Sequence, residues 1–303
     1  MISVVMSIYN EKKEWIKEAI DSILSQSYNN IELIIVLDNP EAVSLKKYLM
    51  EFENRDKRVV VIVNKKNQGL AMSLNKGIEF AHGEYIARMD ADDISLPDRL
   101  KIEKDYLDKH KEISMVGTNI EYIDEAGNDV LSNTMFVSDN LKVKKALRYT
   151  NVFKHPTLMF RLKDIKKVGK YNDINPAQDY ELITRMVLKG YKIANLNVKT
   201  LKYRIRSNSI TSNNALMQMI NAEYIRVNYK KGNYYTKKSY EYFKNKWLKR
   251  ENKFEKSQFY FIKAGENSKK SKILYYWNMV LSCFFSFLRA KKIIYDKYVQ
   301  TIK

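Results

Sequence analysis

The chain has 303 residues, enough for one large domain or for one domain with an appendage, and its hydrophobic content of 45% is ordinary for a globular protein. A single cysteine, Cys283, excludes an internal disulfide and favours a cytoplasmic setting. The formal net charge is +19, with about 20 Lys and Arg against about 6 Asp and Glu from Asn214 onward, which predicts an anionic partner there, either nucleic acid or an anionic membrane surface.

Apolar runs and amphipathic segments alternate over the first ninety or so residues. Alternating strands and helices of this kind predict a mostly parallel sheet with helices on both faces. The expected strands are 2–8, 32–37, 58–63 and 84–89, and the expected helices are 14–26, 41–53 and 70–81.

Polar residues follow three of these strands directly. They are Tyr9, Asp38 and the run 90–93. In open α/β sheets, ligands bind beyond the carboxyl ends of the strands. The positions of these residues therefore predict a nucleotide-type pocket at that edge.

The densest of these clusters places Asp90, Asp92 and Asp93 within four residues. Three neighbouring carboxylates repel one another unless a cation lies close by, and Mg²⁺ and Mn²⁺ prefer oxygen ligands. The cluster is therefore a candidate metal–diphosphate site. The alternative is an acidic turn that caps the helix expected after Pro97.

The pattern changes beyond residue 112. Pro176 is expected to open a helix that carries Asp179 and Glu181 in its first turns and ends at Gly190. This half of the chain is expected to carry the acceptor side of the site. The other expected elements are two strand-like runs in 113–136 around a turn at 125–129, a helix over 139–149, a short strand over 155–160, and strands over 191–196 and 198–205.

From about Thr211 the chain is predicted to be helical, after a weak linker candidate at 206–214. The run 273–288 carries no charge and has basic residues on both sides. It is short for a membrane span, which needs about 20 apolar residues. Two alternatives stay open, a helix lying in a membrane interface and a helix packed in the core.

Eight short motifs, in a fixed order and spacing, resemble those of the inverting family 2 glycosyltransferases of the GT-A fold. The resemblance extends from residue 2 to about residue 205. The motifs are SVVMSIYN at 3–10, SILSQSY at 22–28, ELIIV at 32–36, NQGLA at 67–71, LNKGI at 74–78, GEYIA at 83–87, DADD at 90–93 and PDRL at 97–100.

The resemblance implies a Rossmann-like GT-A domain over 1–205 and a basic, aromatic-rich helical region over 206–303. The nucleotide-sugar half would cover about 1–100, and the acceptor half about 101–205. On the donor side, Ser7 and Tyr9 would lie against the nucleotide base, and Asn67 would also contact the donor. Asp38 would accept a hydrogen bond from the base, typically from uracil N3–H, although an Asp at a strand end is also a common turn former.

The resemblance also implies a metal and a catalytic base. Asp92 would bind Mn²⁺ or Mg²⁺ at the diphosphate, with support from Asp90 and Asp93. Asp179 matches the catalytic-base position, although an acid in the first turn of a helix is also favoured by the helix dipole. Gln178 precedes that base, where the family usually has Glu.

Two further residues match segments that close on the donor or the acceptor. His155 could equally be structural, since it stands before a proline. Arg204 would contact the diphosphate, or only a surface acid. The chain also departs from the family pattern: Leu37 replaces the first of two acids, and Arg206 stands where many members carry His.

The implied activity is transfer of a sugar, with inversion, from a nucleotide donor, expected to be a UDP-sugar, to a glycan or lipid-linked acceptor in surface polysaccharide synthesis. The enzyme is expected to be cytoplasmic and peripheral at the inner face of the cell membrane. It would contact the anionic membrane surface through its C-terminal region and bind no nucleic acid. The alternatives are a nucleotidyltransferase and a basic nucleic-acid-binding protein.

Overall fold

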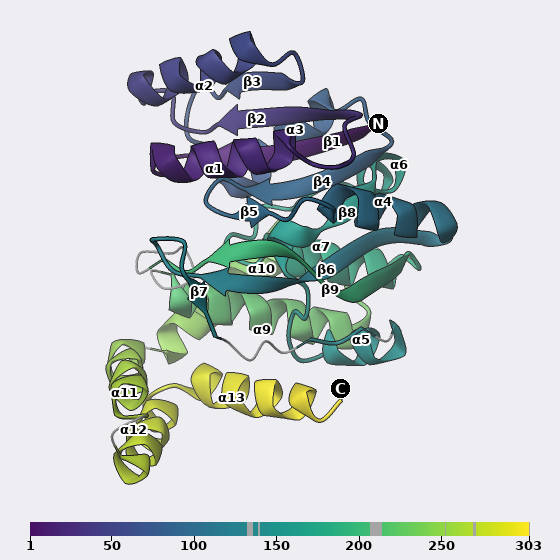
Figure 1. The fold of residues 1–303 in the computed structure, drawn as a ribbon. Coiled ribbons are helices and arrows are strands. Elements are labelled where there is room, and N and C mark those ends of the chain that lie inside the picture. Colours follow the sequence, from purple (N-terminus) through teal and green to yellow (C-terminus); the bar gives the residue numbers. More distant parts are fainter. Residues whose placement is uncertain (132–135, 139, 207–213, 252, 269–270, 303) are drawn as a thin grey trace.

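A computed structural model describes the whole chain except residues 132–135, 139, 207–213, 252, 269–270 and 303. Its centre is a mixed sheet with helices on both faces, and a group of helices follows the sheet in the last third of the chain (Figure 1). The expected α/β fold with a C-terminal helical extension is therefore confirmed. Most of the candidate linker at 206–214 lies outside the described residues.

The first half forms the expected alternation of strands and helices. Its four long strands pair in parallel, and each connecting helix covers one face of the sheet. The elements are β1 (Ile2–Ile8), α1 (Lys13–Leu24), β2 (Ile31–Leu37), α2 (Val43–Arg55), β3 (Val59–Val63), α3 (Leu70–Phe80) and β4 (Tyr85–Asp90).

The second half extends the sheet with strands that pair in both directions, including two long strands that run parallel to each other. The expected hairpin near 125–129 is present as an antiparallel pair. The elements are β5 (Ile94–Ser95), α4 (Arg99–Lys109), β6 (Ile113–Ile123), β7 (Asp129–Val130), α5 (Asn140–Ala146), the 3₁₀ turn η1 (His155–Thr157), β8 (Met159–Arg161), α6 (Leu162–Val168), α7 (Gln178–Leu188) and β9 (Lys192–Arg204). The strand order is β3-β2-β1-β4-β8-β6-β9-β5, with β7 beside β6.

Three predicted boundaries in this half are wrong. The expected strand over 155–160 begins as η1, and the strand that pairs in the sheet is Met159–Arg161. The two strands expected over 191–205 are one strand, β9, because bulges in its pairing with β6 absorb the break in the pattern. Helix α7 begins at Gln178, not at Pro176, because Ala177 has a left-handed φ of 114° that a helix cannot include.

The C-terminal third is helical, as expected. Helix α9 packs on α7, and α13 packs on α9, so both belong to the body of the molecule. Helices α11 and α12 pack on each other and stand away from the sheet (Figure 1). Within the described residues, none of the helices combines the length and apolar character that crossing a membrane requires. The helices are α9 (Ala215–Lys231), α10 (Lys237–Arg250), α11 (Phe254–Asn267), α12 (Lys272–Phe285) and α13 (Phe287–Gln300).

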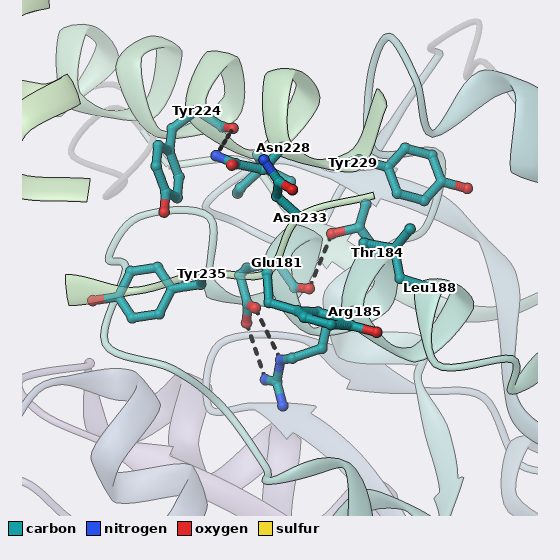
Figure 2. A pocket seen from close by; sticks show the side chains of 11 residues that line it. Glu181, Thr184, Arg185, Leu188, Tyr224, Asn228, Tyr229, Asn233 and Tyr235 are labelled. Carbon is teal, nitrogen blue, oxygen red and sulfur yellow. Dashed lines mark hydrogen bonds and ion pairs between the residues drawn. The ribbon is translucent and has the colours of Figure 1, made fainter. Parts of the chain in front are cut away.

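Helix α7 is fixed by a buried ion pair along the seam with α9. Arg185 donates to both carboxylate oxygens of Glu181, one turn earlier (Figure 2). It also donates to the carbonyl of Val168. The cavity between the two helices has a volume of only about 10 Å³, enough for one water molecule. The contact between α7 and α9 is therefore too tightly packed to hold a ligand, and its role is to hold the first turn of α7 in place.

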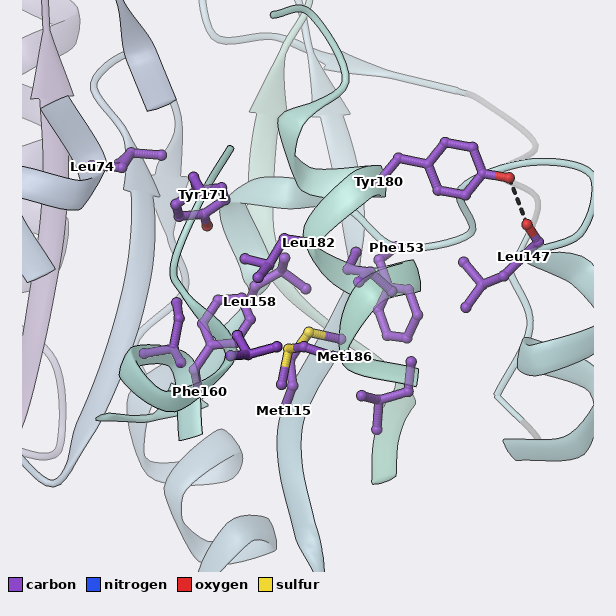
Figure 3. Close-up of a cluster of buried hydrophobic side chains, with 14 of the residues drawn as sticks. Leu74, Met115, Leu147, Phe153, Leu158, Phe160, Tyr171, Tyr180, Leu182 and Met186 are labelled. Carbon is purple, nitrogen blue, oxygen red and sulfur yellow. Dashed lines mark hydrogen bonds between the residues drawn. The ribbon is translucent and has the colours of Figure 1, made fainter. Parts of the chain in front are cut away.

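Two apolar clusters fill the space on either side of the sheet. In β1, Val5 belongs to one cluster, while Val4 and Met6 belong to the other. Figure 3 shows part of the first cluster, in which Phe160 of β8 lies near Leu182 of α7. Because both faces are covered, successive strand residues are all buried, which explains the continuous apolar runs in the sequence.

A fully buried ion pair joins α4 to the strand that carries the acidic cluster. Arg99 donates to Glu103 at 3.0 Å and to the backbone carbonyl of Arg88 at 2.6 Å. Both members of the pair are 0% exposed. Removing one partner would leave the other as an uncompensated buried charge.

We therefore expect Glu103→Ala to lower the free energy of unfolding by about 3–5 kcal/mol, because Arg99 would stay charged and buried. Asp21→Ala is the control, since it breaks a pair with Lys17 at the same spacing on the surface. Urea denaturation of both variants measures the difference. Equal losses in the two variants would contradict a special role for the buried pair.

Candidate active site

Three parallel strands end side by side and open a cleft. The register aligns Ile8 with Leu37 and Ser7 with Asp90, so the residues that follow these strands are brought together. The cleft has a volume of about 750 Å³. Of the site residues expected from the sequence, Asp93 is buried, and the others line the cleft. The lining ones are Ser7, Tyr9, Asp38, Asn67, Asp90, Asp92, His155, Gln178, Asp179 and Arg204.

The acidic cluster has the geometry of a cation site. Asp90, Asp92 and Asp93 each offer a carboxylate oxygen, and these atoms lie within 4.8 Å of one another. Asp93 Oδ1 accepts a hydrogen bond from the backbone N–H of Arg204, whereas its Oδ2 is buried without a hydrogen-bond partner in the described part of the chain. A buried oxygen of this kind is costly, and the oxygen-only donor set suits a hard divalent cation. These residues therefore fit Mg²⁺ or Mn²⁺.

Burial and mutual repulsion weaken the acidity of the cluster. Burial raises the pKa of Asp92 to about 7, the Asp90 carboxylate adds to the rise, and Arg206 opposes it. The pKa of Asp93 is raised well above its usual value, first by burial and then by Asp90 and Asp92. A nearby cation favours the ionised carboxylates and would reverse these shifts.

Two arginines that the sequence did not single out as functional contact the cluster. Arg88 is 3% exposed and forms an ion pair with Asp90, while its Nε and Nη1 are buried without a hydrogen-bond partner among the described residues. Arg206 Nε lies 2.7 Å from Asp92 Oδ2. The sequence does carry a signal for Arg88. Residues two positions apart in a strand point to the same face of the sheet, so Arg88 lies on the same face as Asp90.

Arg204 holds the acidic turn from the other side. Its Nε donates to the backbone carbonyl of Asp92 at 2.8 Å, and its Nη2 donates to Glu18 at 2.5 Å. The guanidinium also lies over the ring of Trp15, 5.4 Å from the ring centroid. Because other parts of the protein already bind this guanidinium, Arg204 stabilises the backbone of the acidic turn.

Asp38 organises the loop before α3. Its Oδ1 accepts hydrogen bonds from the Asn64 side chain and from the Gln68 backbone, and its Oδ2 accepts one from the Gly69 backbone. The loop also carries Asn67, whose side-chain oxygen accepts from the Gly69 N–H. A carboxylate oxygen has two lone pairs, so Asp38 Oδ2 can still accept a hydrogen bond from a ligand.

Asp179, in the first turn of α7, lines the same cleft as Asp90 and Asp92. It is half-buried, and its Oδ2 accepts a 2.8 Å hydrogen bond from the Asn151 side chain. Burial raises the pKa of Asp179. Gln178 comes just before it, is 5% exposed, and accepts a hydrogen bond from the Ala177 backbone through its side-chain oxygen. A carboxylate with one restrained oxygen and increased basicity can act as a general base.

His155 lies in the cleft wall as part of a buried pair. Its Nε2 is 3.0 Å from the Tyr171 hydroxyl, and the two rings meet edge to face. Burial, followed by the charge of Arg88, lowers the pKa of His155 well below its usual value. The imidazole is therefore neutral at ordinary pH.

The C-terminal helices complete the far wall of the cleft. Met219 and Arg226 of α9 and Lys292 of α13 line it, together with Lys154. The sequence placed every expected site residue before residue 206 and missed this contribution. Nothing in the local pattern signals it, because it depends on how distant helices pack.

Residues 3–169 match the family model described as "Glycosyl transferase family 2". Three of the relatives are glycosyltransferases of Methanocaldococcus jannaschii, Erwinia amylovora (amylovoran biosynthesis, AmsE) and Escherichia coli (O-antigen biosynthesis, WbnJ). They are 36%, 32% and 35% identical to this chain over 68%, 69% and 69% of its length and over 71%, 78% and 81% of their own.

A solved structure has the same fold. The crystal structure of S. aureus TarS in complex with UDP-GlcNAc superimposes with a TM-score of 0.60 at 17% sequence identity. The match covers 99% of this chain and 90% of that one. TarS has also been solved in complex with UDP.

The raised pKa of Asp92 gives a stability prediction. In the range from about pH 4 to about pH 7, the folded protein keeps a proton that the unfolded chain has lost, so this group reduces stability as the pH rises. Asp92→Asn removes the titration, and without divalent cations we expect its melting temperature to exceed that of the parent at about pH 8 by a few degrees and to approach it at about pH 5.

Calorimetry at the two pH values measures the effect. Asp173→Asn, which changes an exposed carboxylate, is the control and should follow the parent at both. An Asp92→Asn variant that melts below the parent at about pH 8 would show that the ionised cluster is not destabilising.

Proposed function

This chain belongs to glycosyl transferase family 2, and we propose that it transfers a sugar from a UDP-sugar to a glycan or lipid-linked acceptor, with inversion at the anomeric carbon. The observation that carries the proposal is the cleft itself, in which Asp90 and Asp92 of the acidic cluster and a separate carboxylate, Asp179, line one cavity. Inverting transfer needs both a stabilised leaving group and a base for the acceptor hydroxyl.

On the donor side, we assign the nucleotide to the ends of β1 and β2. Tyr9 is 45% exposed in the cleft and offers a ring face for a base. Asp38 Oδ2 keeps a lone pair for uracil N3–H, and Ser7 and Asn67 line the same region. The TarS complexes with UDP-GlcNAc and UDP support a uridine nucleotide for this fold.

For the cation, we assign Asp92 as the main ligand, with Asp90 and Asp93 in support, and Mn²⁺ or Mg²⁺ as the metal. The unpartnered Asp93 Oδ2 and the closeness of the three carboxylates support the assignment. When bound, such a cation neutralises the charge that grows on a departing diphosphate. Arg204 then acts as a support, since its contacts fix the backbone of the acidic turn.

For the base, we assign Asp179. Asn151 holds one of its oxygens, which leaves the other to take the proton of the acceptor hydroxyl. Burial raises its pKa and so makes it a better proton acceptor. Gln178 and the neutral His155–Tyr171 pair shape the wall beside it and add no charge that would compete for the proton.

The names of two relatives support a proposal for the acceptor class. Two relatives are named for amylovoran and O-antigen biosynthesis, so we propose a surface polysaccharide acceptor. We keep the division into a transferase domain, 1–205, with nucleotide and acceptor halves, and a helical region, 206–303. Helices α9 and α13 of that region share the core and the cleft wall, so we propose that they are part of the working enzyme.

Peripheral attachment to the inner face of the cell membrane is the remaining part of the proposal. We call α11 and α12 the C-terminal hairpin. Apart from Phe254, its buried residues are small or polar (Ser257, Ala264, Asn278 and Ser282), and the Ser257 hydroxyl donates to the Ser282 carbonyl. One aromatic contact, between Tyr260 and Phe285, also joins the two helices. A helix pair in water normally buries its apolar faces against each other and exposes its polar faces. The C-terminal hairpin does largely the opposite.

The outer face of the hairpin is apolar and aromatic. Ile273, Trp277 and Phe284 are 81%, 61% and 79% exposed. Basic residues border this face, including Lys256, Lys263 and Lys272. Aromatic burial in the headgroup region and attraction to anionic lipid act together in such segments, and each Lys or Arg adds about 1 kcal/mol. These exposures favour the membrane-interface alternative over the packed core.

The enzyme assay tests the chemistry. With Mn²⁺ present, we expect UDP-sugars to be hydrolysed or transferred in preference to GDP-sugars, and excess chelator to stop the reaction. Asp179→Asn should abolish transfer and leave UDP affinity nearly unchanged, because it keeps the size of the side chain and removes the basicity. Asp173→Asn is the surface control. Transfer by Asp179→Asn at the parent rate would assign the base elsewhere.

Vesicle co-sedimentation tests the membrane attachment. We expect the parent to bind anionic vesicles at low salt and less well at high salt, because salt screens the lysines. Replacing Ile273, Trp277 and Phe284 by Ser should abolish binding, whereas the same change at three exposed apolar residues elsewhere should not. Those control residues are Val43, Phe80 and Leu141. A parent that binds at neither salt concentration would exclude the interface.

A further inference from the structure

Arg206 is paired with the carboxylate that the proposed function makes the main metal ligand. Its Nε lies 2.7 Å from Asp92 Oδ2, and its guanidinium lies 5.9 Å from the centroid of the Trp15 ring. A guanidinium and a divalent cation are drawn to the same oxygen, and their positive charges repel each other. A metal that uses Asp92 therefore competes with Arg206.

The three arginines around the cluster differ in how firmly they are held. Arg88 belongs to β4 and is 3% exposed, and Arg204 ends β9 with its side chain bound to Glu18 and to the Asp92 carbonyl. Arg206 lies beyond the end of β9, lines the cleft, and has a side chain that is 24% exposed. Its guanidinium can leave Asp92 without breaking a strand contact.

Resting on the proposed function, we infer that Arg206 is an exchangeable counter-ion. It pairs with Asp92 before the donor binds and with the donor's diphosphate afterwards. The exchange balances charge, because the metal takes over Asp92 while the diphosphate gives Arg206 a new anionic partner. Arginine suits this second role, since its planar fork matches phosphate oxygens and stays charged.

The exchange makes metal and nucleotide binding interdependent. The metal alone must displace Arg206 and gives it no new partner, which weakens metal binding. When the nucleotide is present, the displaced guanidinium gains the diphosphate, so the metal binds more tightly. By linkage, the metal must raise nucleotide affinity by the same factor.

Calorimetric titration of Mn²⁺ and of UDP, each alone and with the other, tests the exchange. In Arg206→Gln we expect Mn²⁺ alone to bind about five- to fiftyfold more tightly than in the parent, and UDP to bind more weakly at saturating Mn²⁺, so that the coupling factor shrinks. Arg206→Lys keeps a competing charge without the fork, and its affinity for Mn²⁺ alone should stay near that of the parent.

Arg58→Gln is the matched control, because it breaks an Arg–Asp pair with Asp56 near the start of β3, away from the cleft. It should leave all four affinities unchanged. If Arg206→Gln binds Mn²⁺ alone no more tightly than the parent does, the exchange is wrong and the proposed function stands. If neither protein binds Mn²⁺ with or without UDP, both the exchange and the proposed metal site fail.

Discussion

Three carboxylates at the end of one buried strand are the constraint on which this structure depends. Asp90, Asp92 and Asp93 lie close enough to repel one another, and burial removes the water that would otherwise solvate their charge. Neighbouring arginines partly compensate this negative charge: Arg88 pairs with Asp90, and Arg206 pairs with Asp92. Such an arrangement sacrifices stability for a site that attracts a cation, as functional sites commonly do.

The rest of the fold keeps that site in place. The parallel register of β1, β2 and β4 aligns their carboxyl ends, and the buried Arg99–Glu103 pair fastens α4 to the backbone just before the acidic turn. On the opposite side, the ion pair within α7 and its seam with α9 fix the first turn, where Asp179 lies. The two sides of the cleft are thus held by separate parts of the core.

The strands of the first half and the residues at their ends could be predicted from the sequence. Both faces of the sheet are covered there, so the strands appear as continuous apolar runs. The residues at their ends follow from local turn chemistry. The 3₁₀ turn at His155 and the continuity of β9 could not be predicted in this way. The turn leads into β8, which pairs with β6, and β9 also pairs with β6, so both features depend on distant strands and not on the local pattern. The pairing of Arg206 with Asp92 likewise joins residues more than a hundred positions apart.

The most direct test of the central claim is a crystal structure of the protein with Mn²⁺ and UDP, in which anomalous scattering locates the metal. The account predicts a manganese peak within direct coordination distance of a carboxylate oxygen of Asp92. It also predicts the diphosphate beside that metal and the uracil against Tyr9 and Asp38. A nucleotide bound away from the ends of β1, β2 and β4, or a metal held by residues outside the acidic cluster, would contradict it.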